Sequence, residues 1–235
     1  MLHSQAMEQD FLASVVKGFR TLFLDSSCIG CGTSSQDICQ ECEIDLAAHP
    51  EQIMGEKFRI FASLVYGETE ARIVLAAKED GNRLARRILA GAISKSITEL
   101  IKGYRKHLEI TLVPIPSAAS AIRRRGGEFL RPIIREVVAN SQQDNPGLAI
   151  TIAQVLRINR RVKDQSRLSE SERVANLRFA FELTGKLPRS PIVLIDDVVT
   201  TGSTLREAYR ALQERNLTVL GAVTACASGR RMRIR

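Results

Sequence analysis

The sequence has no apolar run that approaches the roughly 18 to 20 residues a helix needs to cross a bilayer. Its first residues, MLHSQAMEQDF, carry acids where a secretory signal carries bases. We therefore expect a cytoplasmic protein without membrane insertion. Apolar residues are still plentiful, because 44% of the 235 residues are hydrophobic and the mean hydropathy is −0.06. Such a chain is neither disordered nor fibrous, and it can bury the core of one ordinary domain with a small appendage.

Charge is spread unevenly along the chain. The net charge is +8, yet residues 1–60 hold nine acids and four bases, so the excess of positive charge lies in the remainder. A strongly basic region favours anionic ligands or partners. The larger part of the chain is therefore expected to meet anions.

Hydrophobic periodicity divides the chain into helical and strand-like parts. Residues 11–23, 68–77 and 84–101 repeat apolar residues at helical spacing. Beyond Tyr104, strand-like runs alternate with helices. The expected strands are residues 109–114, 148–158, 179–184, 191–196 and 217–227, and the expected helices are residues 129–138 and 203–214. Continuous Val, Ile and Leu runs separated by helices indicate a parallel sheet buried on both faces, which is an α/β fold.

Four cysteines form two C-x-x-C pairs in the stretch CIGCGTSSQDICQEC. Cys28, Cys31, Cys39 and Cys42 can supply four thiolates to one tetrahedral zinc ion at roughly 2.3 Å. Disulfides, which a reducing cytosol disfavours, and an iron–sulfur cluster are the alternatives. A closed four-sulfur site has no open position for a substrate, so we predict a structural zinc that stabilises a small subdomain. The remaining Cys226 is expected to be an inert core residue.

The stretch IVLIDDVVTTGSTL places two adjacent acids, Asp196 and Asp197, at the carboxyl end of an apolar strand. The turn that follows contains Thr200, Thr201, Gly202, Ser203 and Thr204. Hydroxyls and backbone N–H groups at the positive end of a helix dipole favour a phosphate. The acids would repel that phosphate, so they are expected to face sugar hydroxyls or a magnesium ion. The pattern favours a phosphorylated sugar over its alternative, a helix-capping turn beside two solvated acids.

These residues resemble those of a known family. VLIDDVVTTGSTL is similar to the 5-phosphoribosyl-1-pyrophosphate motif of type I phosphoribosyltransferases. LFLDSSCIGCG with the two cysteine pairs, LVPIPSAASAIRRRGGEF and DQSRLSESERVANLRFAF resemble the ComF/GntX family of phosphoribosyltransferase-like proteins, some of them associated with DNA uptake in competent bacteria. The resemblance covers residues 22–227. It implies a helix and zinc-binding subdomain in residues 1–60 and a phosphoribosyltransferase-like domain in residues 61–235.

The resemblance also implies roles for particular residues. Asp196 and Asp197 would hold the ribose 2′ and 3′ hydroxyls directly or through magnesium, and the turn from Thr200 to Thr204 would wrap the 5′-phosphate. Residues 114–117, with Pro116 and Ser117, would contact pyrophosphate, and residues 157–176 would form a loop that closes over it. Further positions that match the family are Lys78, Gln165, Leu168, Ser169, Arg173 and Asn176.

Cleavage of the bond between C1 and pyrophosphate builds negative charge on the leaving group, so catalysis needs magnesium and basic side chains there. Arg160, Arg161 and Lys163 are the expected ones, and closure of their loop would exclude water. The acceptor is not indicated, because only 5% of residues are aromatic and there is no tryptophan to stack on a base.

The alternative function is a phosphoribosyl-binding scaffold or a DNA-uptake protein. Its basic surface, Arg123 to Arg125, Arg131, Arg135 and the tail GRRMRIR, would contact single-stranded DNA. The resemblance to competence proteins implies a partner ATPase in that case.

Overall fold

The structure is a computed structural model, and it describes residues 27–35, 37–55, 57–104, 108–159 and 179–228. The helix predicted at residues 11–23 and the basic tail at residues 229–235 lie outside this part of the chain. None of the helices in the described ranges has the length and apolar character needed to span a membrane.

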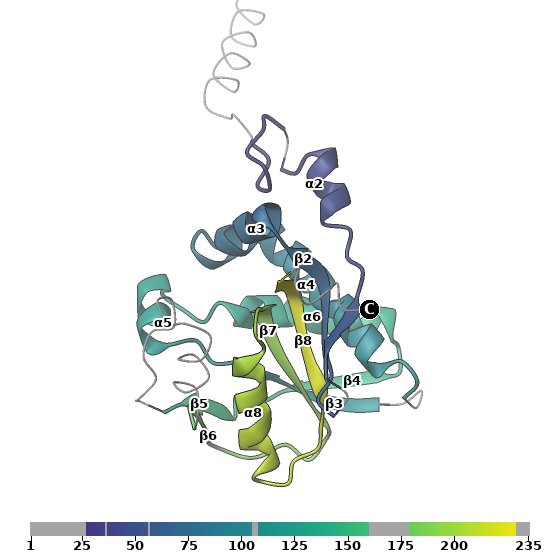
Figure 1. Cartoon of the computed structure of the whole chain (residues 1–235), viewed down its shortest axis with the longest axis vertical. Helices are drawn as coiled ribbons and strands as arrows, with labels where there is room; N and C mark the ends of the chain where they lie inside the picture. Colours follow the sequence, from purple (N-terminus) through teal and green to yellow (C-terminus); the bar gives the residue numbers. More distant parts are fainter. Residues whose placement is uncertain (1–26, 36, 56, 105–107, 160–178, 229–235) are drawn as a thin grey trace, which may run out of the picture.

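A six-stranded sheet forms the centre of the molecule (Figure 1). In spatial order its strands are β1 (Glu51–Met54), β2 (Ile60–Tyr66), β8 (Val219–Ser228), β7 (Ile192–Val199), β3 (Leu108–Pro114) and β4 (Leu148–Ile152). The strands from β2 to β4 are parallel, and β1 pairs with β2 in the antiparallel direction. The predicted α/β fold with a parallel sheet is confirmed.

Helices cover both faces of this sheet (Figure 1). On one face lie α3 (Glu68–Lys78), α4 (Arg83–Ile101) and α6 (Leu130–Asp144), and on the other lies α8 (Ser203–Gln213). The alternation of side chains along β7 serves both layers, since Val193 and Ile195 pack in the core with α4 and α6. Ile192 and Leu194 pack in the core with α8. A strand buried on both sides explains the continuous apolar run at residues 192–195.

Two expectations about strands were wrong. The run at residues 148–158 is not one strand: it divides into β4 and β5 (Leu156–Ile158), which belong to different sheets. The expected strand at residues 179–184 contains β6 (Phe181–Leu183), which pairs with β5 in an antiparallel two-stranded sheet and not with the parallel one. No glycine or proline marks the break after Ile152, so apolar continuity gave no signal of it.

The sequence analysis also missed β2 and misplaced the end of β7. β2 is a run of seven mostly buried residues, and such a short apolar run does not distinguish a strand from a buried helix. β7 continues past the aspartates to Val199, because β8 pairs with it as far as Val199 and Ala227. The two aspartates therefore lie within β7, where it pairs with β8, and not beyond the end of the strand.

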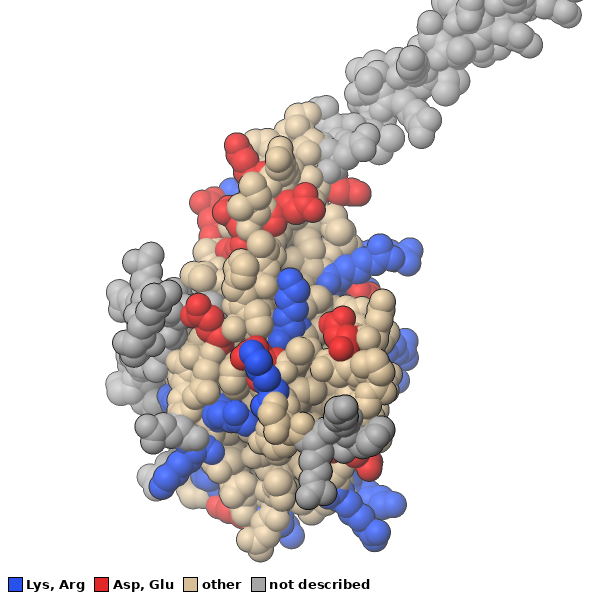
Figure 2. Space-filling view, turned by 90° about the vertical axis from the view of Figure 1, so that its right-hand side faces the viewer, with Lys and Arg blue, Asp and Glu red and all other residues tan. Residues whose placement is uncertain are grey.

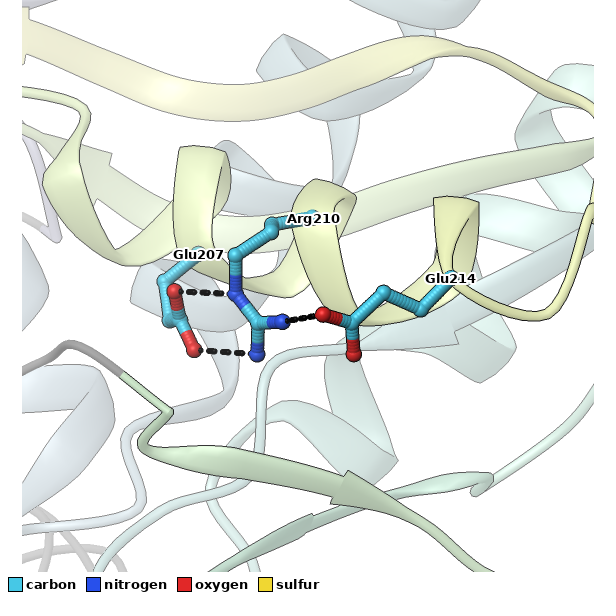
Figure 3. Close-up of polar contacts among 3 residues, drawn as sticks. All are labelled: Glu207, Arg210 and Glu214. Carbon is cyan, nitrogen blue, oxygen red and sulfur yellow. Dashed lines mark hydrogen bonds and ion pairs between the residues drawn. The ribbon is translucent and has the colours of Figure 1, made fainter.

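Three charged side chains at the C-terminal half of α8, Glu207, Arg210 and Glu214, are linked by hydrogen bonds and ion pairs (Figure 3). Nε and Nη2 of Arg210 each donate to one carboxylate oxygen of Glu207 over 2.8 Å, and Nη1 contacts Glu214. Hydrogen bonds that Arg210 donates to Glu207, and then to Glu214, hold the pKa of its guanidinium above the usual value. The same guanidinium lies 4.6 Å from the centre of the Phe179 ring, two residues before β6. Arg210 thus ties the small sheet to the helix.

The cysteine segment lies against the first turns of α3. It contains the short helix α2 (Gln40–Asp45) and a single bridge between Ser27 and Ser34. Arg72 of α3 donates a hydrogen bond to the carbonyl of Cys31 over 2.8 Å. Figure 2 shows acidic side chains gathered at the end of the molecule where this segment lies, with lysines and arginines below them. The division of the chain into two domains at residue 60 stays a prediction. β1, which lies before that residue, pairs with β2 of the main sheet.

Candidate functional site

The order of the strands creates a crevice between β3 and β7. From β3 the chain moves to β4 on one side, whereas β7 lies on the other side of β3 and is followed by β8. Such a reversal of strand order leaves a crevice at the carboxyl ends of the two central strands, where α/β proteins bind ligands. The N–H of Ile115 donates to the carbonyl of Ile195 over 2.9 Å and holds the two strand ends together. The residues that follow Pro114 and those that follow Ile195 therefore line the same crevice.

Two carboxylates stand at the β7 side of this crevice. Asp197 is buried, with 8% of its surface exposed, and Asp196 is half-buried. Oδ1 of Asp196 accepts a hydrogen bond from the N–H of Asp197 over 2.9 Å. Oδ2 of Asp197 forms an ion pair with Nζ of Lys78, the last residue of α3. The structure thus brings Lys78, one of the positions that match the family, to the aspartates.

The negative charges of Asp196 and Asp197 outnumber the positive charge of Lys78 beside them. Burial, and next the charge of Asp197, raise the pKa of the Asp196 carboxyl well above its usual value. Burial lowers the pKa of Lys78, but attraction to Asp197 outweighs it and the pKa is raised overall. The ammonium also lies 5.2 Å from the centre of the Phe129 ring. Among the described residues, the two neighbouring carboxylates therefore share one ion-pair partner, Lys78, which leaves them suited to receive a further cation or hydroxyl donors.

The turn after β7 forms a compact loop at the start of α8. Gly202 adopts φ +72, and a Cβ placed there would lie 2.7 Å from Sδ of Met54 in β1. The hydroxyls of Thr201 and Ser203 lie 2.8 Å apart, and the N–H of Ser203 donates to the Thr201 hydroxyl over 3.3 Å. Arg206 donates to the carbonyl of Thr201 over 2.5 Å. The loop therefore holds hydroxyls and a helix N-terminus beside the carboxylates.

The hydroxyl-bearing residues of this turn remain accessible. Thr200 is exposed, whereas Thr201, Ser203 and Thr204 are half-buried, and only Gly202 is buried. The Ser228 hydroxyl at the end of β8 lies 3.4 Å from the carbonyl of Thr200, to which it donates. A phosphate placed here would meet hydroxyls and the positive end of an eleven-residue helix.

The β3 side of the crevice carries Pro116 and Ser117, which are both half-buried. They lead into α5 (Ala119–Arg125), whose last turn holds Arg123, Arg124 and Arg125. Arg124 lies 3.9 Å from the carboxylate of Glu79, directly after Lys78. The loop after β3 and the end of α3 therefore face the same crevice.

Several predicted residues lie outside the described part of the chain. They are Arg160, Arg161, Lys163, Gln165, Leu168, Ser169, Arg173 and Asn176. The chain on either side of them is described, and the N–H of Asn159 donates to the carbonyl of Ala180 over 2.7 Å. The segment thus begins and ends at the β5–β6 pair.

The four cysteines form a cluster whose Sγ atoms all lie within 4.8 Å of one another. A tetrahedron of zinc–sulfur bonds of about 2.3 Å places sulfurs about 3.8 Å apart, so the cluster fits such an ion. Sγ of Cys28 accepts N–H bonds from Gly30 over 3.4 Å and Cys39 over 3.3 Å. Burial opposes ionisation of Cys28, but the backbone N–H groups of Cys31, Cys39 and Gly30 lower its pKa to about 6, whereas burial raises the pKa of Cys42. Cys226 is fully buried in the core, as the sequence predicted.

Three residues near the crevice were not foreseen from the sequence: Met54, Phe129 and Arg206. Met54 comes from a strand distant in sequence, so no local pattern points to it. Phe129 directly precedes α6, and its apolar spacing marked it only as a helix residue. Arg206 is one helical turn after Gly202, a spacing that places it back over the loop and that could have identified it.

A family model of the phosphoribosyl transferase domain matches residues 87–233, which is more than half of the chain. The protein therefore belongs to the phosphoribosyl transferase domain family, and its fold and crevice agree with that class. The match begins after Lys78 and the cysteine cluster. No protein with a curated description matches the sequence.

Solved structures to which the chain is similar are also phosphoribosyltransferases. The hypoxanthine enzyme of Staphylococcus aureus is 15% identical over 60% of this chain, with a TM-score of 0.37, and 65% of its own length is spanned. The adenine enzyme of Saccharomyces cerevisiae is 13% identical over 79% of this chain and 86% of its own, with a TM-score of 0.37. The orotate enzyme of Mycobacterium tuberculosis is 14% identical over 79% and 81%, with a TM-score of 0.35. At these values the similarities add no argument about substrates.

Proposed function

We propose that the protein binds 5-phosphoribosyl-1-pyrophosphate with magnesium at the β3–β7 crevice and transfers the phosphoribosyl group to an acceptor. The observation that carries this proposal is the pair Asp196 and Asp197 directly before a hydroxyl-rich turn at the start of α8. A ribose phosphate needs both halves: hydroxyl partners for the sugar and N–H donors for the phosphate. The family match supports phosphoribosyl transfer in general.

The raised pKa of Asp196 supports a cation or hydroxyl ligand here. Asp197 already has Lys78 as an ion-pair partner, whereas Asp196 has no ion pair with any residue that the structure describes and accepts the backbone N–H of its neighbour. Carboxylates of this kind suit magnesium, which when bound would neutralise charge on the departing pyrophosphate. Pro116 and Ser117 are proposed to contact that pyrophosphate, and the basic residues between 160 and 176 to close over it.

In this proposal the four cysteines hold a structural zinc, and the protein belongs with the ComF/GntX group. The support is the fit of the sulfur cluster to a tetrahedral ion. A closed sulfur cluster on the first turns of α3 would stabilise that helix, which carries Lys78 at its far end.

Ligand-dependent thermal stabilisation tests the site. Magnesium with phosphoribosyl pyrophosphate should raise the melting temperature, and Asp196→Asn with Asp197→Asn should abolish the shift. Asp144→Asn, an exposed change at the end of α6, is the matched control and should keep it. A shift that survives the double change would refute the site. Tracing labelled phosphoribosyl pyrophosphate through a panel of nitrogenous bases would then identify the acceptor.

Exposed arginines on α5 favour one second candidate function, contact with single-stranded DNA. Arg123 and Arg124 are exposed next to the crevice. Oligonucleotide binding should then weaken steeply with salt and with Arg123→Gln plus Arg124→Gln. A response that is flat to both would remove this candidate and, with it, the need for a partner ATPase.

A further inference from the structure

A cavity of about 450 Å³ lies beside the crevice, on the far side of the loop after β3. Its walls come from residues 114–117, from α6, and from the chain between β4 and β5. No residue of β7 or α8 lines it, so it is separate from Asp196 and Asp197 and from the turn that runs from Thr200 to Thr204. The volume is within the range of about 300 to 1,000 Å³ typical of small-molecule sites.

The floor of this cavity is apolar and rigidly held. Ile115, Leu130, Ile134 and Leu156 line it, and each is at least nine-tenths buried. They come from three parts of the chain, the loop after β3, α6 and β5, so the floor is part of the folded core and not of one loop. A flat apolar ring is the kind of group that such a floor accepts.

The rim of the cavity is cationic. Arg131 and Arg135 lie one turn apart on α6, and both line the cavity and are exposed. Neither forms a hydrogen bond or an ion pair with any residue that the structure describes. Among the described lining residues the one acid is Glu128, which accepts a hydrogen bond from Gln154 over 2.7 Å. Within the described residues, the two guanidinium groups beside the apolar floor therefore have no carboxylate partner.

We infer that this cavity binds a small planar anion, a ring that carries a carboxylate. The ring would lie on the apolar floor, and Arg131 and Arg135 would hold the carboxylate at the rim. This site goes beyond the proposed phosphoribosyl function and does not depend on it. The two share only the wall formed by residues 114–117, so a ligand in the cavity would lie next to the pyrophosphate loop of that proposal.

Pairs of probes that differ by the carboxylate test the site. Orotate with uracil, and nicotinate with nicotinamide, should be titrated into the full-length protein by calorimetry or ligand-observed NMR. At least one carboxylate should bind about tenfold more tightly than its uncharged partner, because a hydrogen bond between a guanidinium and a carboxylate is stronger than one to a neutral group. Arg131→Gln and Arg135→Gln should each remove that preference.

Arg123→Gln is the matched control, since Arg123 is an exposed arginine of α5 that does not line the cavity. It should leave the preference unchanged, and all three variants should keep the thermal shift with magnesium and phosphoribosyl pyrophosphate. The inference fails if neither carboxylate is preferred, or if the preference survives both cavity variants. It also fails if Arg131→Gln and Arg135→Gln weaken only oligonucleotide binding, which would assign these arginines to a nucleic-acid surface. Loss of the thermal shift in wild-type protein would refute the phosphoribosyl proposal alone.

Discussion

The four-cysteine segment and the carboxyl end of β7 each bring acidic side chains close together. The two regions differ in how much of the surrounding fold holds those side chains in place. Cys28 and Cys42 are buried in a segment with one short helix and a single β-bridge. Asp196 and Asp197 stand on an eight-residue strand paired on both sides within the main sheet. The first region lacks a core large enough to hold it, whereas the second is held whether or not a ligand is bound. Ligand removal should therefore affect them unequally.

The largest effect is expected from removal of the proposed zinc. Structural zinc contributes about 10 to 16 kcal/mol to the folding of zinc-finger peptides, so chelation should unfold residues 27–46 locally. Hydrogen exchange should show lost protection there and retained protection in residues 192–199. Elemental analysis should find one metal ion per chain, lost in Cys28→Ser but kept in Cys226→Ala. Retained metal in Cys28→Ser, or retained protection after chelation, would contradict this.

Replacement of Gly202 should have a smaller effect on the free energy of unfolding, because the strain is confined to the turn from Thr200 to Thr204. Alanine at φ +72 costs roughly 1 to 2 kcal/mol, and its Cβ would also lie 2.7 Å from Sδ of Met54. Gly126 is a matched control, because it has φ +71 and nothing within 4 Å of the added Cβ. In urea titrations, Gly202→Ala should lower the free energy of unfolding by about 1 kcal/mol more than Gly126→Ala does. Equal losses would mean that Met54 yields freely.

The smallest effect separates the two aspartates. Asp196→Asn should stabilise the ligand-free protein slightly, because the ionised form of Asp196 is disfavoured in the folded state. Asp197→Asn should destabilise it by about 1 kcal/mol, because Lys78 loses its charged partner. Urea titrations of both variants at neutral pH measure these changes. Shifts of the same sign would contradict the imbalance described for this pair.

The pH dependence follows from the same raised pKa. Above the raised folded pKa of Asp196 the wild type carries the full cost of ionising this carboxyl, and that cost is relieved as the pH falls from the folded value toward the pKa of unfolded Asp, about 3.9. The stabilities of wild type and Asp196→Asn should therefore converge on acidification. Affinity for magnesium and phosphoribosyl pyrophosphate should fall over the same interval, because the ligand prefers the ionised carboxylate.

The sequence predicted features that depend on local pattern. Strands β3, β7 and β8, the cysteine cluster and the turn from Thr200 to Thr204 each occupy a short stretch with a recognisable spacing. The sequence did not predict pairing between distant segments, such as β1 with β2 or β5 with β6. It also gave no signal of the cavity, whose floor joins Ile115 to Leu156 across the chain. Such contacts depend on register and topology, which apolar runs do not specify.

The contact between Met54 and Gly202 has a consequence for how the protein can be shortened. A protein truncated at residue 60 would keep both aspartates, the whole turn and the loop after β3. It would nevertheless lose the sulfur that packs against Gly202 and the strand that covers the first half of β2. An exposed sheet edge would then lie beside the turn, open to pairing with another chain. Residue 50, ahead of β1, is therefore the safer place to begin a shortened protein.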